Sequence, residues 1–153
     1  MQFWQNRRPL ILIAALLVAF SNAPALAAPY LVMDVDSGRV LEQQDAFKRW
    51  YPASLSKLMT AYVVFRAVEA GQVRLSSPVR ISKNAAEEPP SKMGFPPGAV
   101  LTLDNALKII MVKSANDVTT AIAETIAGSE AGFAARMTAE AQRLGMTDSH
   151  FVN

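Results

Sequence analysis

Residues 51–60 read YPASLSKLMT, and this stretch decides how the rest of the chain is interpreted. A helical pattern, with spacings of three and four residues, runs through Leu55, Leu58, Met59, Tyr62, Val63 and Arg66. Such spacing is typical of an amphipathic helix that packs on one face. Pro52 suits the entry to a helix, and Gly71 suits its C-terminal end. We therefore predict a helix from about residue 53 to residue 70, with Ser54 in its first turn.

Ser54 and Lys57 lie three residues apart in this helix and therefore share a face, with Cβ atoms about 5–6 Å apart. A serine hydroxyl becomes a good nucleophile when a neighbouring base takes its proton. Lysine can be that base where burial or a positive potential lowers its pKa, and a helix N-terminus supplies about half a positive charge. The alternative is an N-cap serine beside a solvated lysine, because S-x-x-K alone is a weak motif.

Length and composition exclude several classes of protein. A chain of 153 residues has room for one domain of ordinary size. It has no cysteine, which excludes a disulfide scaffold, thiol chemistry and thiolate zinc sites, and its single histidine argues against a histidine-rich metal site. We expect neither a metal nor an organic cofactor. The net charge is only +2, and Arg7 and Arg8 supply that excess, so nothing favours nucleic-acid binding.

The first 27 residues have the order of a secretory signal peptide. Arg7 and Arg8 come first, an almost wholly apolar run follows from Pro9 to Phe20, and small residues end in Ala25-Leu26-Ala27. The apolar run is shorter than the roughly 20 residues of a membrane-spanning helix. We predict cleavage after Ala27 and location in the periplasm or cell envelope, with an uncleaved membrane anchor as the alternative.

The elements after residue 28 predict an α+β protein. An apolar run at residues 30–35, a turn at Asp36-Ser37-Gly38 and a second run at 39–42 predict an antiparallel hairpin. We interpret Asp34, Asp36 and Asp45 as turn residues, because their spacing is not that of a calcium loop. The remaining predicted segments are an extended stretch at 74–81, a loop at 82–98 with Glu87 and Glu88 in solvent, and helices at 101–113, 117–127 and 129–144.

Ser114-Ala115-Asn116 is a second motif, placed between two predicted helices. A hydroxyl there can pass a proton to a leaving amine, and an amide can donate to a substrate carbonyl and accept from a lysine. The alternative is that Ser114 and Asn116 merely cap the next helix, since such caps are abundant. Ser82-Lys83-Asn84 has the same spacing, but it lies in the proline-rich loop, so we favour the later copy.

The two motifs together resemble those of the penicillin-binding serine D,D-carboxypeptidases, peptidase family S11. The resemblance rests on residues 52–57 (PASLSK) and 114–117 (SAND), and it extends over 91–112 and over 145–153. It implies that essentially all of residues 28–153 is the N-terminal part of such a domain. The implied fold is β-lactamase/transpeptidase-like and incomplete, a hairpin plus a helical cluster without the remaining strands of the sheet.

The resemblance also implies a role for each matching residue. Ser54 would attack the carbonyl of a terminal D-alanyl-D-alanine peptide and form an acyl-enzyme, with Lys57 as the base. Ser114 would relay the proton to the departing D-alanine, and Asn116 would orient substrate and lysine. Peptidoglycan stem peptides would be the substrates, and β-lactam antibiotics would acylate the same serine. His150 would not be catalytic.

The third motif of the family, Lys-Thr/Ser-Gly on a strand beside the site, does not occur in the sequence. In the family it lies beyond the point that corresponds to Asn153, and it binds the terminal carboxylate of the substrate. Its strand supplies one of two oxyanion donors, whose loss costs about 10²–10³ in rate. We expect the chain as written to be inactive or weakly folded, and we expect membrane association only through a C-terminal anchor that it lacks.

Three alternatives stay open. A class A β-lactamase shares both motifs, but no Glu-x-x-Leu-Asn follows Ser114, and Ala115 stands where those enzymes usually carry Asp. The second alternative is a non-catalytic penicillin- or peptidoglycan-binding module. Acylation by a penicillin would distinguish an enzyme from such a module. The third alternative is a secreted helical protein in which the motifs occur by chance.

Overall fold

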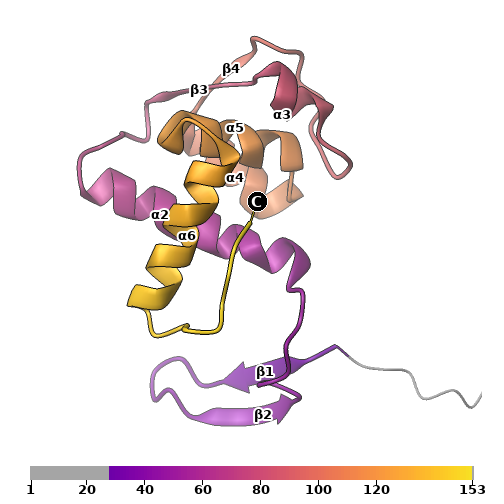
Figure 1. Cartoon of the computed structure of the whole chain (residues 1–153), viewed down its shortest axis with the longest axis vertical. Coiled ribbons are helices and arrows are strands. Elements are labelled where there is room, and N and C mark those ends of the chain that lie inside the picture. The colour runs from indigo at the N-terminus through magenta and orange to yellow at the C-terminus, as the bar shows by residue number, and fades with distance from the viewer. Residues whose placement is uncertain (1–27, 153) are drawn as a thin grey trace, which may run out of the picture. The chain divides into compact units, whose positions relative to one another are not determined.

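The computed structural model describes residues 28–152, so the expected signal peptide at 1–27 lies outside the described residues. The chain forms two compact units, of which the first ends at Tyr51 and the second begins at Pro52. Each unit is described by itself below. The described elements combine a small amount of β structure with a majority of helix, as predicted (Figure 1).

The first unit contains the predicted antiparallel hairpin. Strand β1 (Tyr30–Met33) pairs with β2 (Val40–Gln44), and the register shifts after Val32. Asp34 organises the turn, because its carboxylate accepts a hydrogen bond from the backbone N–H of Ser37 at 2.8 Å and another from the Ser37 hydroxyl. These bonds, above all the one from the hydroxyl, lower the pKa of Asp34. The interpretation of Asp34 as a turn residue is therefore confirmed.

The second unit consists of helices with one short strand pair (Figure 1). In chain order its elements are the 3-10 turn η2 (Ala53–Leu55), α2 (Ser56–Glu69), β3 (Pro78–Arg80), α3 (Lys83–Glu87), β4 (Val100–Thr102), α4 (Leu103–Lys113), α5 (Asn116–Ala127) and α6 (Glu130–Arg143). Strands β3 and β4 are antiparallel, with Val79 opposite Leu101. The chain after α6 returns along that helix, where the backbone N–H of Phe151 donates to the hydroxyl of Thr138 at 3.0 Å.

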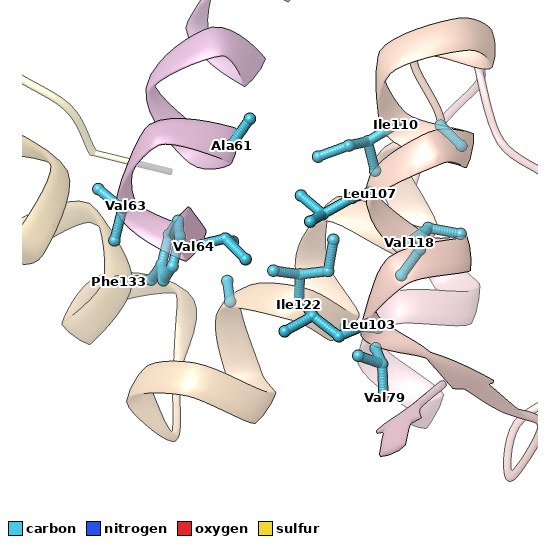
Figure 2. Packing of buried hydrophobic residues seen from close by; sticks show 14 of the residues in the cluster. Ala61, Val63, Val64, Val79, Leu103, Leu107, Ile110, Val118, Ile122 and Phe133 are labelled. Carbon is cyan, nitrogen blue, oxygen red and sulfur yellow. The ribbon is translucent and has the colours of Figure 1, made fainter. Parts of the chain in front are cut away.

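Helix α5 is the centre of this unit, because it contacts α2, α3, α4, α6 and β3. Its Val118 and Ile122 are fully buried, and Figure 2 shows them among the side chains that the neighbouring elements contribute. Burial of one such side chain stabilises the fold by about 1.5–3 kcal/mol. The labelled partners in Figure 2 are Ala61, Val63 and Val64 of α2, Val79 of β3, Leu103, Leu107 and Ile110 of α4, and Phe133 of α6.

Several helix ends carry residue types that typically end or cap a helix. Thr102 caps α4 by accepting from the backbone N–H of Asn105 at 3.3 Å, and Ser129 caps α6 by accepting from that of Gly132 at 3.0 Å. Gly128 ends α5 with a φ of 78°, in the left-handed region that glycine adopts without strain.

The predicted loop at residues 82–98 is partly wrong. It contains the one-turn helix α3, which is too short for its apolar period to be visible. The prediction of a solvated pair holds for Glu87, which is exposed, but not for Glu88, which is half-buried and accepts a hydrogen bond from the Thr120 hydroxyl at 3.0 Å. Residues 100–102, expected at or before a helix start, form strand β4.

Helices long and apolar enough to cross a bilayer do not occur between residues 28 and 152.

Candidate active site

The start of α2 presents Ser54 to solvent. Ala53 has a φ of 49°, in the left-handed region, and begins the 3-10 turn that precedes α2. Ser54 follows in that turn, and the backbone N–H of Leu55 donates to the carbonyl of Pro52 at 3.1 Å. No side chain caps η2 or α2, so the alternative that Ser54 is an ordinary N-cap is wrong.

Lys57 lies in the first turn of α2 and is half-buried. Its Nζ donates a hydrogen bond to Oδ1 of Asn116 at 2.9 Å. Burial lowers the pKa of Lys57 from its ordinary value, and the negative charge of Glu88 opposes that shift. The alternative of a freely solvated lysine is therefore wrong. A depressed pKa gives more neutral amine near neutral pH than a free lysine has, which is what a general base requires.

Ser54, Lys57 and Ser114 line one cleft of about 440 Å³. This volume is within the range of small-molecule sites, about 300–1,000 Å³. The other lining residues are mainly apolar and come from the start of α2 and the end of α4: Pro52, Leu55, Leu58, Ile110 and Met111. His150 lines a different hollow, formed by α6 and the segment that follows it.

Ser114 ends α4 in the left-handed conformation, with φ 58° and ψ 36°. Among residues 28–152 its Oγ is a buried side-chain atom without a hydrogen-bond partner. An unsatisfied buried hydroxyl costs about 1–3 kcal/mol, and such a group in a cleft is free to bond with a ligand. Helix α5 has Ala115 as its N-cap and no side-chain cap, so the alternative that Ser114 merely caps this helix is wrong.

Asn116 begins α5, and its backbone N–H, its Nδ2 and its Oδ1 each make a hydrogen bond. Its backbone N–H donates to the carbonyl of Ser91 at 2.7 Å, and its Nδ2 donates to the carbonyl of Pro89 at 3.0 Å. Its Oδ1 accepts from Lys57. A side-chain amide has two N–H donors, so one remains to meet a ligand carbonyl.

Asp117 is a residue that the sequence interpretation missed. It is fully buried, and its carboxylate accepts from the backbone N–H groups of Met93 at 3.1 Å and Gly94 at 2.9 Å. The N–H of Val118 adds a third bond at 2.9 Å. Asp117 and Asn116 together hold residues 88–94, which we call the clamp segment, against the start of α5. A second polar residue directly after Ser-x-Asn was the only sequence signal for this.

The earlier copy of the Ser-x-Asn spacing, Ser82-Lys83-Asn84, makes structural hydrogen bonds. Ser82 caps α3 by accepting from the backbone N–H of Ala85 at 2.9 Å. Asn84 donates to Glu124 at 3.1 Å and to Glu130 at 2.8 Å. The preference for the later copy of the motif agrees with this geometry. Within residues 28–152, no three His, Cys, Asp or Glu side chains are grouped so that they could hold a metal ion.

The sequence matches a known family. The model of the D-alanyl-D-alanine carboxypeptidases, peptidase family S11, matches residues 18–153. D-alanyl-D-alanine carboxypeptidase DacF of Bacillus subtilis (strain 168) is 35% identical over 123 residues, which are 80% of this chain and 32% of the relative. The chain thus spans about a third of the length of this curated relative.

Solved structures agree with the predicted fold class. The D-alanyl-D-alanine carboxypeptidase DacD from Francisella tularensis superimposes with a TM-score of 0.79 at 35% identity, over 86% of this chain and 32% of that one. Penicillin binding protein 5 from Haemophilus influenzae gives 0.75 at 32% identity, over 84% and 39%. These neighbours confirm the prediction of a transpeptidase-like α+β fold, of which this chain spans a part.

Proposed function

The chain belongs to the D-alanyl-D-alanine carboxypeptidase family of peptidases, and from this premise we propose that its cleft is the acylation site of a serine-type D-alanyl-D-alanine carboxypeptidase. The observation that carries the proposal is the half-buried Lys57, held by Asn116 in a cleft that Ser54 and Ser114 also line. A nucleophile, a desolvated base and a second hydroxyl within one cleft are the requirements of acyl transfer.

The proposed first step forms an acyl-enzyme. Neutral Lys57 accepts the proton of the Ser54 hydroxyl as the oxygen attacks the carbonyl of the penultimate D-alanine of the substrate. The backbone N–H of Ser54, near the positive end of α2, is one donor to the oxyanion. Collapse of the tetrahedral intermediate breaks the peptide bond and leaves an ester on Ser54.

The proton must then reach the departing amine. The Ser114 hydroxyl lines the cleft and has no partner among the described residues, so it can donate its proton to the D-alanine nitrogen and take one from the Lys57 ammonium. Asn116 fixes the lysine and has a free N–H for the substrate carbonyl. Water, activated by neutral Lys57, then cleaves the ester and restores Ser54.

The proposed substrates are peptidoglycan stem peptides that end in D-alanyl-D-alanine. The relatives carry this activity in their names, and one structural neighbour is named a penicillin binding protein. Membership of this family supports a location in the cell envelope. We place this protein there, delivered by the signal peptide predicted at residues 1–27. β-Lactams would acylate Ser54 in place of the substrate.

Labelling with a fluorescent penicillin, followed by a denaturing gel and peptide mapping, tests the proposal. We expect label on the peptide that contains Ser54, loss of label in Ser54→Ala, and retention in Ser56→Ala. Ser56 is the matched control, because it lies in the same helix start but does not line the cleft. A chimera in which the C-terminal part of DacF follows Asn153 is tested in parallel.

The outcomes are distinct. Label in the chain or in the chimera, lost with Ser54→Ala, supports the nucleophile assignment. Absence of label from both proteins would overturn it. Release of D-alanine from a D-alanyl-D-alanine peptide marks a carboxypeptidase, whereas absence of both label and release marks a non-catalytic module. Rapid turnover of the penicillin would instead mark a β-lactamase.

A further inference from the structure

Glu88, at the start of the clamp segment, is tied to the helix that carries Asn116. Its Oε1 accepts a hydrogen bond from the hydroxyl of Thr120 at 3.0 Å. Thr120 is buried in α5, four residues after Asn116, and residues at this spacing share one face of a helix. The half-buried carboxylate of Glu88 and the side chain of Asn116 are therefore held on the same side of α5.

The backbone beside Glu88 reinforces this arrangement. The next residue, Pro89, accepts a hydrogen bond from Nδ2 of Asn116 at 3.0 Å, while Oδ1 of the same amide accepts from Lys57 at 2.9 Å. One asparagine side chain thus links the clamp segment to the lysine. Movement of the Glu88 side chain away from α5 would break its hydrogen bond to Thr120. Movement of the backbone at this point would break the hydrogen bond between Pro89 and Asn116.

The carboxylate of Glu88 acts electrostatically on Lys57. Burial lowers the pKa of Lys57, and the charge of Glu88 is the effect that opposes it. The other charged groups that α4, α5, α6 and the clamp segment bring toward this region are engaged elsewhere or exposed. Asp117 accepts from the clamp backbone and Glu124 from Asn84, Lys92 donates to the carbonyl of Ala86, and Lys113 is exposed. Glu130 accepts from Asn84 at 2.8 Å and also lies 3.5 Å from the Thr120 hydroxyl, a longer contact than the 3.0 Å from that hydroxyl to Glu88.

We propose that Glu88, anchored by Thr120, is a positioning residue that places a negative charge opposite Lys57 and thereby sets the pH range in which Ser54 is acylated. The inference rests on the proposed function, since it concerns the same lysine. The charge does two things. It stabilises the ammonium that forms when Lys57 takes the proton of Ser54, and it limits how far burial weakens the lysine as a base.

The charge of Glu88 determines the pH at which acylation begins to rise. If neutral Lys57 is the base, acylation rises with pH as the ammonium loses its proton. Removal of the Glu88 charge favours the neutral amine, so this rise moves to lower pH. At a fixed pH below the rise, Glu88→Gln should acylate roughly threefold to tenfold faster than the native chain. At high pH it should be slower, because a weaker base drives the proton transfer less.

Penicillin acylation of the full chain, measured as a pH profile from mildly acidic to alkaline conditions, is the experiment, because the profile shows both the rise in rate and any shift of it. Glu88→Gln tests the charge and Thr120→Val tests the anchor, with Thr120→Ser as the variant that restores the hydroxyl. The matched control is Glu87→Gln, which removes the same charge one residue away. The Glu87 side chain is 69% exposed and faces Lys83 at 3.9 Å.

We expect the profiles of Glu88→Gln and Thr120→Val to shift to lower pH, and those of Glu87→Gln and Thr120→Ser to follow the native chain. A Glu88→Gln profile that overlays the native one, or an equal shift in Glu87→Gln, would overturn the inference. A uniform loss of rate at every pH would do so too, since a purely structural role has that result.

A second measurement separates this inference from the proposed function. The ¹³C chemical shift of the Lys57 Cε, assigned with Lys57→Gln, reports the titration of the amine without any reaction. We expect it to titrate at lower pH in Glu88→Gln than in the native chain. An unchanged titration would overturn the role of Glu88 even in a reactive protein. A shifted titration, together with absence of penicillin label from both the chain and the chimera, would support the electrostatic link while the proposed function fails.

Discussion

The candidate site is held from two sides, which we call walls and which are built in different ways. One is the start of α2, which lines the cleft, and the other is the start of α5, whose Asn116 binds Lys57 without lining the cleft. On one wall, Ser54 lies exposed in a 3-10 turn entered through the left-handed Ala53, and side chains cap neither this turn nor α2. On the other wall, Asn116 and the buried Asp117 start α5 with hydrogen bonds to four residues of the clamp segment. The reactive wall is held locally, whereas the opposite wall is fixed by distant parts of the chain.

This difference shows which part of the fold fixes the position of Lys57. The hydrogen bond from Lys57 to Asn116 joins the two walls at 2.9 Å, so the strongly held wall sets the position of the base. Ser54 needs only the geometry of its own helix to lie beside that base. We therefore expect stability to depend on the α5 wall and reactivity to depend on Ser54.

Asp117→Ala should have the largest effect. It removes a buried carboxylate and leaves the N–H groups of Met93, Gly94 and Val118 without their acceptor. The net contribution of a hydrogen bond to a charged group is about 1.5–3 kcal/mol, and loss of three such bonds is partly offset because the buried carboxylate no longer has to be desolvated, so we expect the free energy of unfolding to fall by about 3 kcal/mol. Urea denaturation measures it, with Ser54→Ala expected to stay within about 0.5 kcal/mol of the native chain. Equal losses in the two variants would show that the walls are not held differently.

Ser114→Gly should have an intermediate effect of the opposite sign. It removes an unsatisfied buried hydroxyl and replaces a residue at φ 58° with one that adopts this conformation without strain. We expect the free energy of unfolding to rise by about 1–2 kcal/mol. Penicillin labelling of Ser54 should decrease in the same variant, because the proton relay is lost. A loss of stability would mean that the hydroxyl has a structural partner.

Ala53→Gly should have the smallest effect. The left-handed φ of 49° costs an L-residue about 1–2 kcal/mol, but glycine adds conformational entropy to the unfolded chain. The net rise in the free energy of unfolding should be about 0.5 kcal/mol, measurable by thermal denaturation in parallel with the native chain. A fall of similar size would indicate that contacts of the Ala53 methyl outweigh the strain in this turn.

Much of the helical unit could be predicted because its signals are local. The apolar period and Gly71 located α2, the helices expected at 117–127 and 129–144 correspond to α5 and α6, and the spacing of Ser54 and Lys57 follows from helix geometry alone. Helix α3 escaped prediction because one turn carries no measurable period. Strand β4 was not predicted because it is only three residues long and ends at Thr102, which is also the N-cap of α4.

The clamp segment could not be predicted because its partners are distant or carry no side-chain signal. Asp117 binds backbone N–H groups 23 and 24 residues earlier, and any residue type except proline could supply them. Glu88 lies in a run of charged and proline residues that is typical of a solvated loop. Its burial depends on Thr120, which is 32 residues later and looks like an ordinary helix residue.

The hydrogen bonds of the site also close loops of very different length, which implies an order of assembly. The bond from Met93 to Asp117 spans 24 residues, and the one from Lys57 to Asn116 spans 59. The logarithmic growth of loop entropy makes the longer closure about 0.8 kcal/mol more costly. Because Ser54 precedes Asn116 in the sequence, Ser54 leaves the ribosome well before Asn116 during synthesis. We expect the serine to remain chemically inert throughout synthesis and to become reactive only when the second half of the helical unit has docked.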